Sequence, residues 1–251
     1  MRNLRGAIVF LTRVPLRLSG EPNLTDSVPW FPVAGALVGA TVGGTAAGLV
    51  QIVSPFVAAS VAVMLGVLIT GAFHEDGLAD VADAFAGGWT LEDRIRILDD
   101  PLHGSYGVAA LCGSILIRVA CIAALGFSPA ATFACIVAAH ALGRGAAVGL
   151  MAIVPVARPD GLGAEYARSL SRGRATCGGL AAIAISGIAV GWWAGPFLLA
   201  AIVGAAIVAW LTMRKLGGIT GDVLGTAEQV VECLVLITAA AIVKHHSLWW
   251  R

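Results

Sequence analysis

The chain has 251 residues, of which 58% are hydrophobic and only 12% are charged, and its net charge is +1. A soluble globular protein carries about 25% charged residues, so this chain has too few to cover a water-facing surface. The near-neutral charge gives no bulk attraction to nucleic acid. The five cysteines are scattered and form no CxxC or Cys/His cluster, which argues against a disulfide framework or a zinc site. We therefore predict an all-α protein, a single polytopic transmembrane helical bundle over residues 1–251.

Seven apolar stretches come close to the roughly 20 residues that a membrane-spanning helix needs. They cover residues 32–53, 55–73, 106–126, 129–154, 177–194, 196–213 and 228–243. Tight, uncharged connections alternate with long, charged ones, and the long ones cover 74–105, 155–176 and 214–227. In an up-and-down path, all three charged loops share one side of the membrane with the N-terminus.

The basic residues predict which side that is. Of the 16 lysines and arginines, 12 lie in the N-terminal segment and the three charged loops. Because cytoplasmic loops carry an excess of Lys and Arg, we expect these loops in the cytoplasm. All 15 acidic residues lie on the same side or at its membrane edge, so any chemistry is expected to face the cytoplasm.

The first apolar stretch contains glycines at four-residue spacing, Gly35, Gly39 and Gly43. Small residues at this spacing allow two helix backbones to approach closely within a membrane. We therefore predict that this face packs tightly against another helix.

The most informative segment runs from His74 to Asp83. Its residues Asp76, Asp80 and Asp83 are spaced i, i+4, i+7, which places them on one face of a helix. Like charges at this spacing repel, and the segment contains no lysine or arginine. With apolar flanks, a merely solvated acidic face is the weaker interpretation. Oxygen ligands favour Mg²⁺ or Mn²⁺ over zinc, so we predict a metal site here, with Glu75 assisting.

Two further segments belong to the same side. Asp100 to Gly107 is rich in Gly, Ser and Pro, which indicates an ordered loop whose free backbone N–H groups, as at Gly104, could hold a phosphate. Gly217 to Gly225, which includes Asp222, is similar. Glu228 and Glu232 follow it, and Glu232 falls within an apolar stretch, where a carboxylate is a functional hypothesis by default.

Arg118 and Arg144 also fall within apolar stretches. An arginine there needs a polar partner, and two interpretations stay open: pairing with the carboxylates, or holding a phosphate. Carboxylate-held Mg²⁺, basic residues and glycine-rich loops together suggest phosphoryl-group chemistry.

At these residues the chain resembles the cobalamin synthase family, the adenosylcobinamide-GDP ribazoletransferases of the bacterial inner membrane. The acidic segment and Thr220-Gly221-Asp222 are specific in combination. The matching segments are Phe10 to Pro15, His74 to Asp83, Asp100 to Gly107, Ala157 to Gly163, and Gly217 to Glu232.

The resemblance implies the reaction. The ribose 3′-hydroxyl of α-ribazole, or of its 5′-phosphate, attacks the cobinamide-linked phosphorus of adenosylcobinamide-GDP and releases GMP. The family is Mg²⁺-dependent. The resemblance also implies a protein embedded in the lipid bilayer. Other late cobalamin-pathway enzymes and a second copy of the chain are its possible partners. By analogy with the CDP-alcohol phosphotransferases, Asp83 is the expected general base, and Asp76 and Asp80 are mainly metal ligands. If Asp83 is instead a ligand, the base is expected at Asp100, Asp222 or His103. The expected substrate contacts are Arg13, His103, Gly104, Arg144, Asp222, Glu228 and Glu232.

The chain departs from the family in one loop. The family commonly has an arginine at the position of His103 and a basic residue at the position of Asp99. Arg94, Arg96 or Arg144 would then have to supply the positive charge.

Two other functions use the same residues. A lipid-type CDP-alcohol phosphotransferase fits poorly, because its motif has Ala-Arg after the first Asp-Gly, whereas Leu78-Ala79-Asp80 follows Asp76-Gly77 here. A cation transporter would place its carboxylates near the bilayer midplane on broken helices. Most acids of this chain cluster at one membrane face instead, which favours an enzyme.

Overall fold

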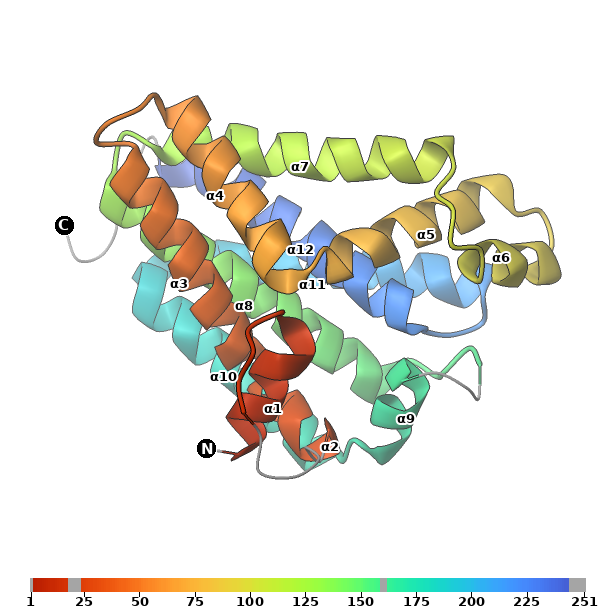
Figure 1. The fold of residues 1–251 in the computed structure, drawn as a ribbon. Coiled ribbons are helices and arrows are strands. Elements are labelled where there is room, and N and C mark those ends of the chain that lie inside the picture. The colour runs from red at the N-terminus through yellow and green to blue at the C-terminus, as the bar shows by residue number, and fades with distance from the viewer. Residues whose placement is uncertain (1, 18–23, 159–161, 244–251) are drawn as a thin grey trace.

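The computed structural model describes residues 2–17, 24–158 and 162–243, and Figure 1 shows their arrangement. The described residues form helices joined by short connections, with one isolated parallel β-bridge between Val156 and Ile219 and no strand. This confirms the predicted all-α fold. In chain order the helices are α1 (Arg2–Leu11), α2 (Leu24–Ser27), η1 (Val28–Trp30), α3 (Phe31–Leu49), α4 (Pro55–Thr70), α5 (Phe73–Gly87), α6 (Leu91–Leu98), α7 (Ser105–Leu125), α8 (Pro129–Ile153), α9 (Leu162–Ser169), α10 (Arg172–Val190), η2 (Gly191–Trp193), α11 (Ala194–Lys215) and α12 (Gly221–Val243).

Several of these helices are long and apolar enough to cross a membrane. Five continuous helical segments of the described chain meet that test, or six if α4 and α5, which are bent by 90°, count as one span. The protein is thus a multi-pass membrane protein, but the predicted count of seven is not confirmed. The segments are Thr25–Leu49, Ser105–Leu125, Pro129–Ile153, Arg172–Lys215 and Gly221–Ile242.

The difference in count arises at α10 and α11, which the sequence separates into two stretches. In the structure they run on through η2 as one helical segment of 44 residues. Residues of both halves, such as Ile183 and Ala205, nevertheless line one apolar cavity with α8. The chain therefore folds back on α8 at η2, where Gly191 has a φ of 58°.

The connections segregate to two ends of the bundle, as the alternation of loop types predicts. Figure 1 shows the tight connections α3–α4, α7–α8 and α10–α11 at one end and α5, α6 and α9 toward the other. At the charged end, the Lys215 ammonium donates to the carbonyl of Phe85 over 2.9 Å, and Arg174 pairs with Asp26. The charged segments thus share one end of the molecule.

The predicted glycine face packs α3 against α8. A Cβ built on Gly35 would lie 2.6 Å from the carbonyl oxygen of His140, and one on Gly39 would lie 2.9 Å from His140 Cβ. At Gly43 the nearest atoms belong to Phe133, at 3.1 Å. Because real Cβ atoms do not approach backbone this closely, glycine is what allows these two helices to touch, and the prediction of tight packing is confirmed.

A sharp break separates α4 from the acidic helix α5. Gly71 and Ala72 both adopt left-handed backbone conformations, with φ of 67° and 58°. Arg13 holds the break from outside: its N–H donates to the carbonyl of Ile69 over 2.7 Å, and its side chain lies against Gly71. The break ends the apolar helix and turns the acidic segment away from it, so that α5 packs against α7 and α12.

Candidate functional site

The three predicted aspartates of α5 face the loop that precedes α7. His103 of that loop bridges two of them: its Nε2 lies 3.3 Å from Asp76 Oδ1, and its Nδ1 lies 3.2 Å from Asp80 Oδ1. The Asp76 side chain is 64% exposed and that of Asp80 is 14% exposed. The shared helical face is therefore confirmed, and its outer end is open to solvent.

Asp83 is the innermost of the three and is only 8% exposed. Its Oδ2 accepts the backbone N–H of Gly104 over 2.7 Å. A Cβ on Gly104 would lie 2.6 Å from Asp83 Oδ1, and Gly107 also lies against this carboxylate. The N–H of Gly104, which the sequence suggested for a phosphate, is thus engaged by Asp83.

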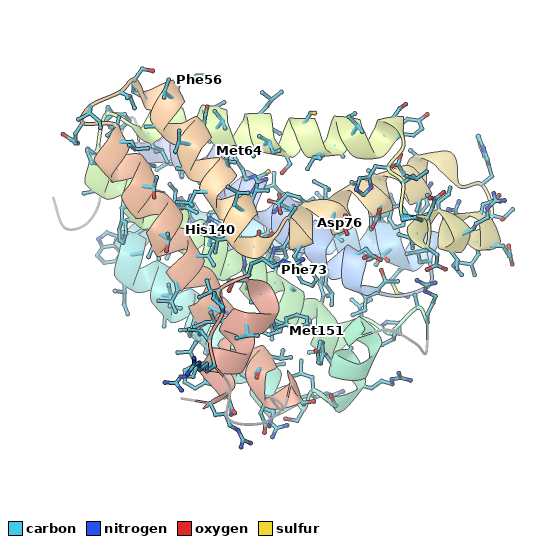
Figure 2. The ribbon with its side chains drawn as sticks, viewed as in Figure 1. Phe56, Met64, Phe73, Asp76, His140 and Met151 are labelled. Carbon is cyan, nitrogen blue, oxygen red and sulfur yellow. The ribbon has the colours of Figure 1, made fainter. Side chains whose placement is uncertain are left out.

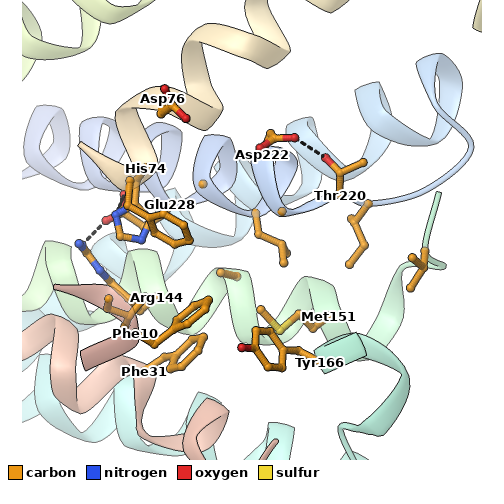
Figure 3. A pocket seen from close by; sticks show the side chains of 18 of the residues that line it. Phe10, Phe31, His74, Asp76, Arg144, Met151, Tyr166, Thr220, Asp222 and Glu228 are labelled. Atoms are coloured by element: carbon orange, nitrogen blue, oxygen red, sulfur yellow. Dashed lines mark hydrogen bonds and ion pairs between the residues drawn. The ribbon is translucent and has the colours of Figure 1, made fainter. Parts of the chain in front are cut away.

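The first turn of α12 brings Asp222 against the acidic helix. A Cβ on Gly77 would lie 2.8 Å from the carbonyl oxygen of Asp222, and the Thr226 hydroxyl donates to the carbonyl of Gly77 over 3.0 Å. Thr220 Oγ1 lies 3.4 Å from Asp222 Oδ2. Gly77 therefore allows α5 and α12 to approach, which places Asp222 beside Asp76 (Figure 3).

A cavity of about 290 Å³ opens beside these carboxylates. It contains Asp76 and Asp222 on one side and a group of aromatic rings from α1, α3 and α9 on the other (Figure 3). Its lining combines aromatic, aliphatic, basic and acidic groups, as a ligand site usually does. The lining residues include Phe10, Phe31, Phe73, His74, Asp76, Arg144, Met151, Arg158, Tyr166, Thr220, Asp222 and Glu228.

Below the cavity, α8 and α12 share a buried ion network around Arg144. Its Nη1 donates to Glu228 Oε1 and to Glu232 Oε2, the latter over 3.0 Å, and lies 2.8 Å from His140 Nδ1. Among the described residues, His140, Glu228 and Glu232 form the one group whose ligand atoms converge closely enough to hold a metal. Arg144 Nη1 contacts all three of these residues. The guanidinium thus supplies the positive charge that a metal ion would otherwise bring to this group.

The second buried arginine extends this network to α5. Arg118 Nη1 lies 3.0 Å from Glu75 Oε1 and 3.6 Å from Glu232 Oε1, and Gln229 also donates to Glu75 over 3.2 Å. Arg118 and Arg144 therefore both pair with carboxylates, which is the first of the two interpretations that the sequence left open. Glu75, expected as an assisting metal ligand, turns to Arg118 and away from the aspartates. Figure 2 labels Asp76 on α5, beside the cavity, and His140 on α8, in the buried network.

Four of the predicted site residues line the cavity, namely Asp76, Arg144, Asp222 and Glu228. The other predicted residues lie outside its lining, namely Arg13, Glu75, Asp80, Asp83, Asp100, His103, Gly104 and Glu232. Two of them also lie apart from the three aspartates. Arg13 is exposed and covers the α4–α5 break. Asp100 is exposed, and its Oδ1 accepts the backbone N–H of Leu102 over 3.0 Å, which stabilises the turn before His103. Neither residue contacts the three aspartates through a described hydrogen bond.

Arg158 is a cavity residue that was not predicted from the sequence, although it lies in a segment that carries the resemblance. Arg158 lines the cavity, and its Nη1 lies 2.9 Å from both carboxylate oxygens of Asp99. The other candidates for a positive charge are engaged elsewhere. Arg94 donates to backbone carbonyls, including that of Lys215, and Arg96 pairs with Asp93. Asp99 carries no positive charge itself. It pairs with Arg158, and Arg158 is the residue that brings a positive charge to the cavity.

The fold and the site define a multi-pass helical membrane protein with a carboxylate-rich cavity at the charged end of its bundle. The model of the cobalamin-5-phosphate synthase family matches residues 3–240, and the chain belongs to this family.

Curated relatives agree along nearly the whole length. An adenosylcobinamide-GDP ribazoletransferase of Ralstonia nicotianae is 40% identical over 244 residues, 94% of this chain and 93% of the relative. The protein of the same name from Ralstonia pickettii is 38% identical over 240 residues, 92% of this chain and 91% of the relative. That from Chlorobaculum tepidum is 35% identical over 248 residues, 97% of this chain and 96% of the relative. No solved structure matches the chain.

Proposed function

We propose that this protein is an adenosylcobinamide-GDP ribazoletransferase that acts in the final steps of cobalamin biosynthesis. The names of its relatives support the activity, and one structural observation supports the location of the site. Asp76 and Asp222, which are far apart in the sequence, line the same cavity from α5 and α12. A phosphoryl-transfer site needs such convergent oxygen groups beside a space for the substrate.

The reaction replaces one phosphate ester by another. The oxygen of the ribose 3′-hydroxyl of α-ribazole, or of its 5′-phosphate, forms a bond to the cobinamide-linked phosphorus. The bond from that phosphorus to the oxygen bridging it to the guanosine-bearing phosphate breaks, GMP leaves, and adenosylcobalamin or its 5′-phosphate forms. The hydroxyl proton passes to a base on the enzyme.

We infer Mg²⁺ as the cofactor from the oxygen chemistry of Asp76, Asp80 and Asp222, whose ligand atoms would have to draw closer together to hold one ion. Carboxylate oxygens are the ligands that it prefers, with waters and substrate phosphates completing its coordination. Asp76 and Asp80 would hold it from α5, with Asp222 on α12. When bound, the ion neutralises phosphate charge and polarises the phosphorus–oxygen bond. The His103 ring now lies between Asp76 and Asp80, so it must move aside or share these carboxylates.

Asp83 stays the proposed general base. The N–H of Gly104 orients its carboxylate through Oδ2, which leaves Oδ1 to accept the proton of the ribose hydroxyl. A base must lie within about 2.6–3.2 Å of that hydroxyl or one water away. Asp83 is buried and does not line the cavity that contains Asp76 and Asp222. The ribose hydroxyl would therefore have to reach past Asp80 along the face of α5, or pass its proton to Asp83 through a water.

The charged end of the bundle is proposed to face the cytoplasm, with the protein in the bacterial inner membrane. The excess of Lys and Arg in the charged loops supports this orientation. Nucleotide substrates would then reach the cavity from the compartment in which they are made.

A cation transporter would use carboxylates at membrane depth, and Glu228 and Glu232 are such carboxylates. Both, however, contact the Arg144 guanidinium. A transport site that already holds a fixed cation repels the ion it should carry. This pairing favours the enzyme over the transporter.

The test uses the purified chain in liposomes, with adenosylcobinamide-GDP, α-ribazole and Mg²⁺. We expect Mg²⁺-dependent turnover that Asp80→Ala abolishes, while the matched control Glu92→Ala, at an exposed position of α6, retains it. Mg²⁺-independent turnover, or full activity of Asp80→Ala, would contradict the metal site. Ion flux through the same liposomes without turnover would favour the transporter.

A further inference from the structure

The aromatic side of the cavity has a composition that neither a metal nor a phosphate requires. We propose that it is the subsite for the planar base of the acceptor nucleoside, with the base lying among the rings and the ribose directed toward Asp76 and Asp222. This proposal rests on the proposed function and assigns a place within it to one of the two substrates.

The aromatic group is built around Phe10, a residue of α1. Its ring stacks on Phe31 with centroids 5.4 Å apart and an interplanar angle of 9°. It meets Phe73 and Tyr166 edge-on, at 5.5 Å and 5.2 Å. All four rings line the cavity. Four helices thus each contribute one ring, and such surfaces bind a flat heteroaromatic base by stacking and edge contacts.

Two buried nitrogen atoms of the lining give this apolar space a polar end. His74 and Arg144 are 4% and 3% exposed, and both line the cavity. Among the described residues, Arg144 Nε has no hydrogen-bond partner, and His74 Nδ1 has none either, its nearest carboxylate oxygen being Glu228 Oε2 at 3.8 Å. A buried polar atom without a partner is costly in a protein, and a bound ligand with a suitable acceptor would satisfy it.

The chemistry of these groups selects between the two substrates. The base of α-ribazole is a largely apolar benzimidazole with one free ring nitrogen, which can accept a hydrogen bond from Arg144 Nε. Guanine carries several donors and acceptors around its edge. An aromatic wall would leave most of them unpaired, at a cost for each. The aromatic group therefore fits the acceptor base better than the guanine of the donor.

The position of the aromatic group also suits the reaction. Figure 3 shows Phe10, Phe31 and Tyr166 across the cavity from Asp76 and Asp222. A nucleoside whose base lies among the rings would extend its ribose toward the carboxylates. Donor and acceptor would then meet at the carboxylate side, with the guanosine portion outside the aromatic group.

The test compares Michaelis constants for the two substrates in full-length variants reconstituted in liposomes. Phe10→Leu removes the central ring. Phe73→Leu removes a ring that is 47% exposed, so it provides a second variant with less risk to folding. Phe56→Leu is the matched control, because Phe56 is 62% exposed on α4 and absent from the cavity lining. Stacking losses of this kind correspond to roughly tenfold weaker binding.

We expect the KM for α-ribazole to rise about tenfold in Phe10→Leu and Phe73→Leu. The KM for adenosylcobinamide-GDP should stay within twofold, and Phe56→Leu should match the unmodified protein. A nucleoside with a C–H in place of the free ring nitrogen should also bind more weakly to the unmodified protein, and this difference should shrink in Arg144→Lys. A rise in the KM for adenosylcobinamide-GDP alone, or unchanged constants in both cavity variants, would overturn the subsite.

A binding measurement separates this proposal from the proposed function. Equilibrium dialysis of α-ribazole with the purified protein needs no turnover. If the unmodified protein fails to release GMP but binds α-ribazole and loses that binding in Phe10→Leu and Phe73→Leu, the function is wrong and the subsite stands. If GMP is released normally and neither variant weakens α-ribazole binding, the subsite is wrong and the function stands.

Discussion

Gly104 donates its backbone N–H to Oδ2 of Asp83 over 2.7 Å, which ties the loop before α7 to the acidic face of α5. The same bond restricts the direction in which Asp83 presents its other oxygen. If Asp83 is the general base, this loop positions the base, and the glycine at 104 is needed because a Cβ there would collide with the carboxylate.

Asp83→Asn keeps the size of the side chain and removes its ability to accept a proton. We expect kcat to fall by about 10²–10⁴, the usual contribution of general acid–base catalysis. The affinities for Mg²⁺ and adenosylcobinamide-GDP should stay within a few-fold, as measured by titration of each in steady-state assays. If Asp83→Asn loses Mg²⁺ affinity as fully as Asp76→Asn does, Asp83 is a metal ligand, and the base must be sought at Asp100, Asp222 or His103.

The contact between α3 and α8 predicts a sharp difference between two glycines of one helix. A Cβ on Gly35 would lie 2.7 Å from Arg144 Cδ, whereas one on Gly44 would meet no described atom within 4 Å. Gly35→Ala should lower the thermal unfolding temperature in detergent by several degrees and reduce activity, because Arg144 is displaced. Gly44→Ala should be neutral or stabilising by up to about 1 kcal/mol, since alanine favours the helix. Equal effects of the two substitutions would contradict this packing.

The buried pair of Arg118 and Glu75 predicts a recoverable loss of stability. Arg118→Met leaves the Glu75 carboxylate buried without its main partner, and breaking such a pair costs about 3–5 kcal/mol. Adding Glu75→Gln removes the unpaired charge, so the double variant should regain part of that loss. Chemical or thermal unfolding of the purified proteins measures both effects. A double variant less stable than Arg118→Met would show that Glu75 is stabilised by other groups.

The proposed orientation can be tested with single cysteines in a background without the five native ones. Cysteines at Trp89 and Arg172, both exposed at the charged end, should resist an impermeant thiol reagent added outside intact cells. A cysteine at Gln51, in the tight connection between α3 and α4, should react and serves as the positive control. Labelling at Trp89 or Arg172 but not at Gln51 would reverse the orientation.

Local periodicity was sufficient to predict part of this architecture. The i, i+4, i+7 spacing of Asp76, Asp80 and Asp83 correctly predicted their shared face, because helix geometry alone determines it. The glycine spacing of α3 likewise predicted tight packing. Both features depend on residues of a single helix.

The remaining features depend on contacts between helices, which a single sequence does not contain. The partner of Arg118 is a carboxylate 43 residues away, and that of Arg144 is 84 residues away. Glu75 lies beside Asp76 in sequence, yet its side chain meets Arg118 and not the aspartate face of α5. The pairing of Asp99 with Arg158 and the left-handed residues before α5 also follow from tertiary packing. The predicted count of seven spans is not confirmed, because α10, η2 and α11 form one continuous helical segment of 44 residues even though the chain folds back at η2.

The central claim is that the cobinamide phosphate moves from adenosylcobinamide-GDP to α-ribazole. The most direct measurement quantifies GMP and the ribazole-containing product together, by mass spectrometry, in one reaction of the purified protein in liposomes with Mg²⁺. We predict one GMP for each molecule of adenosylcobalamin or its 5′-phosphate, and no GMP when α-ribazole is left out. Release of GDP in place of GMP, or GMP release without a ribazole-containing product, would contradict this transfer.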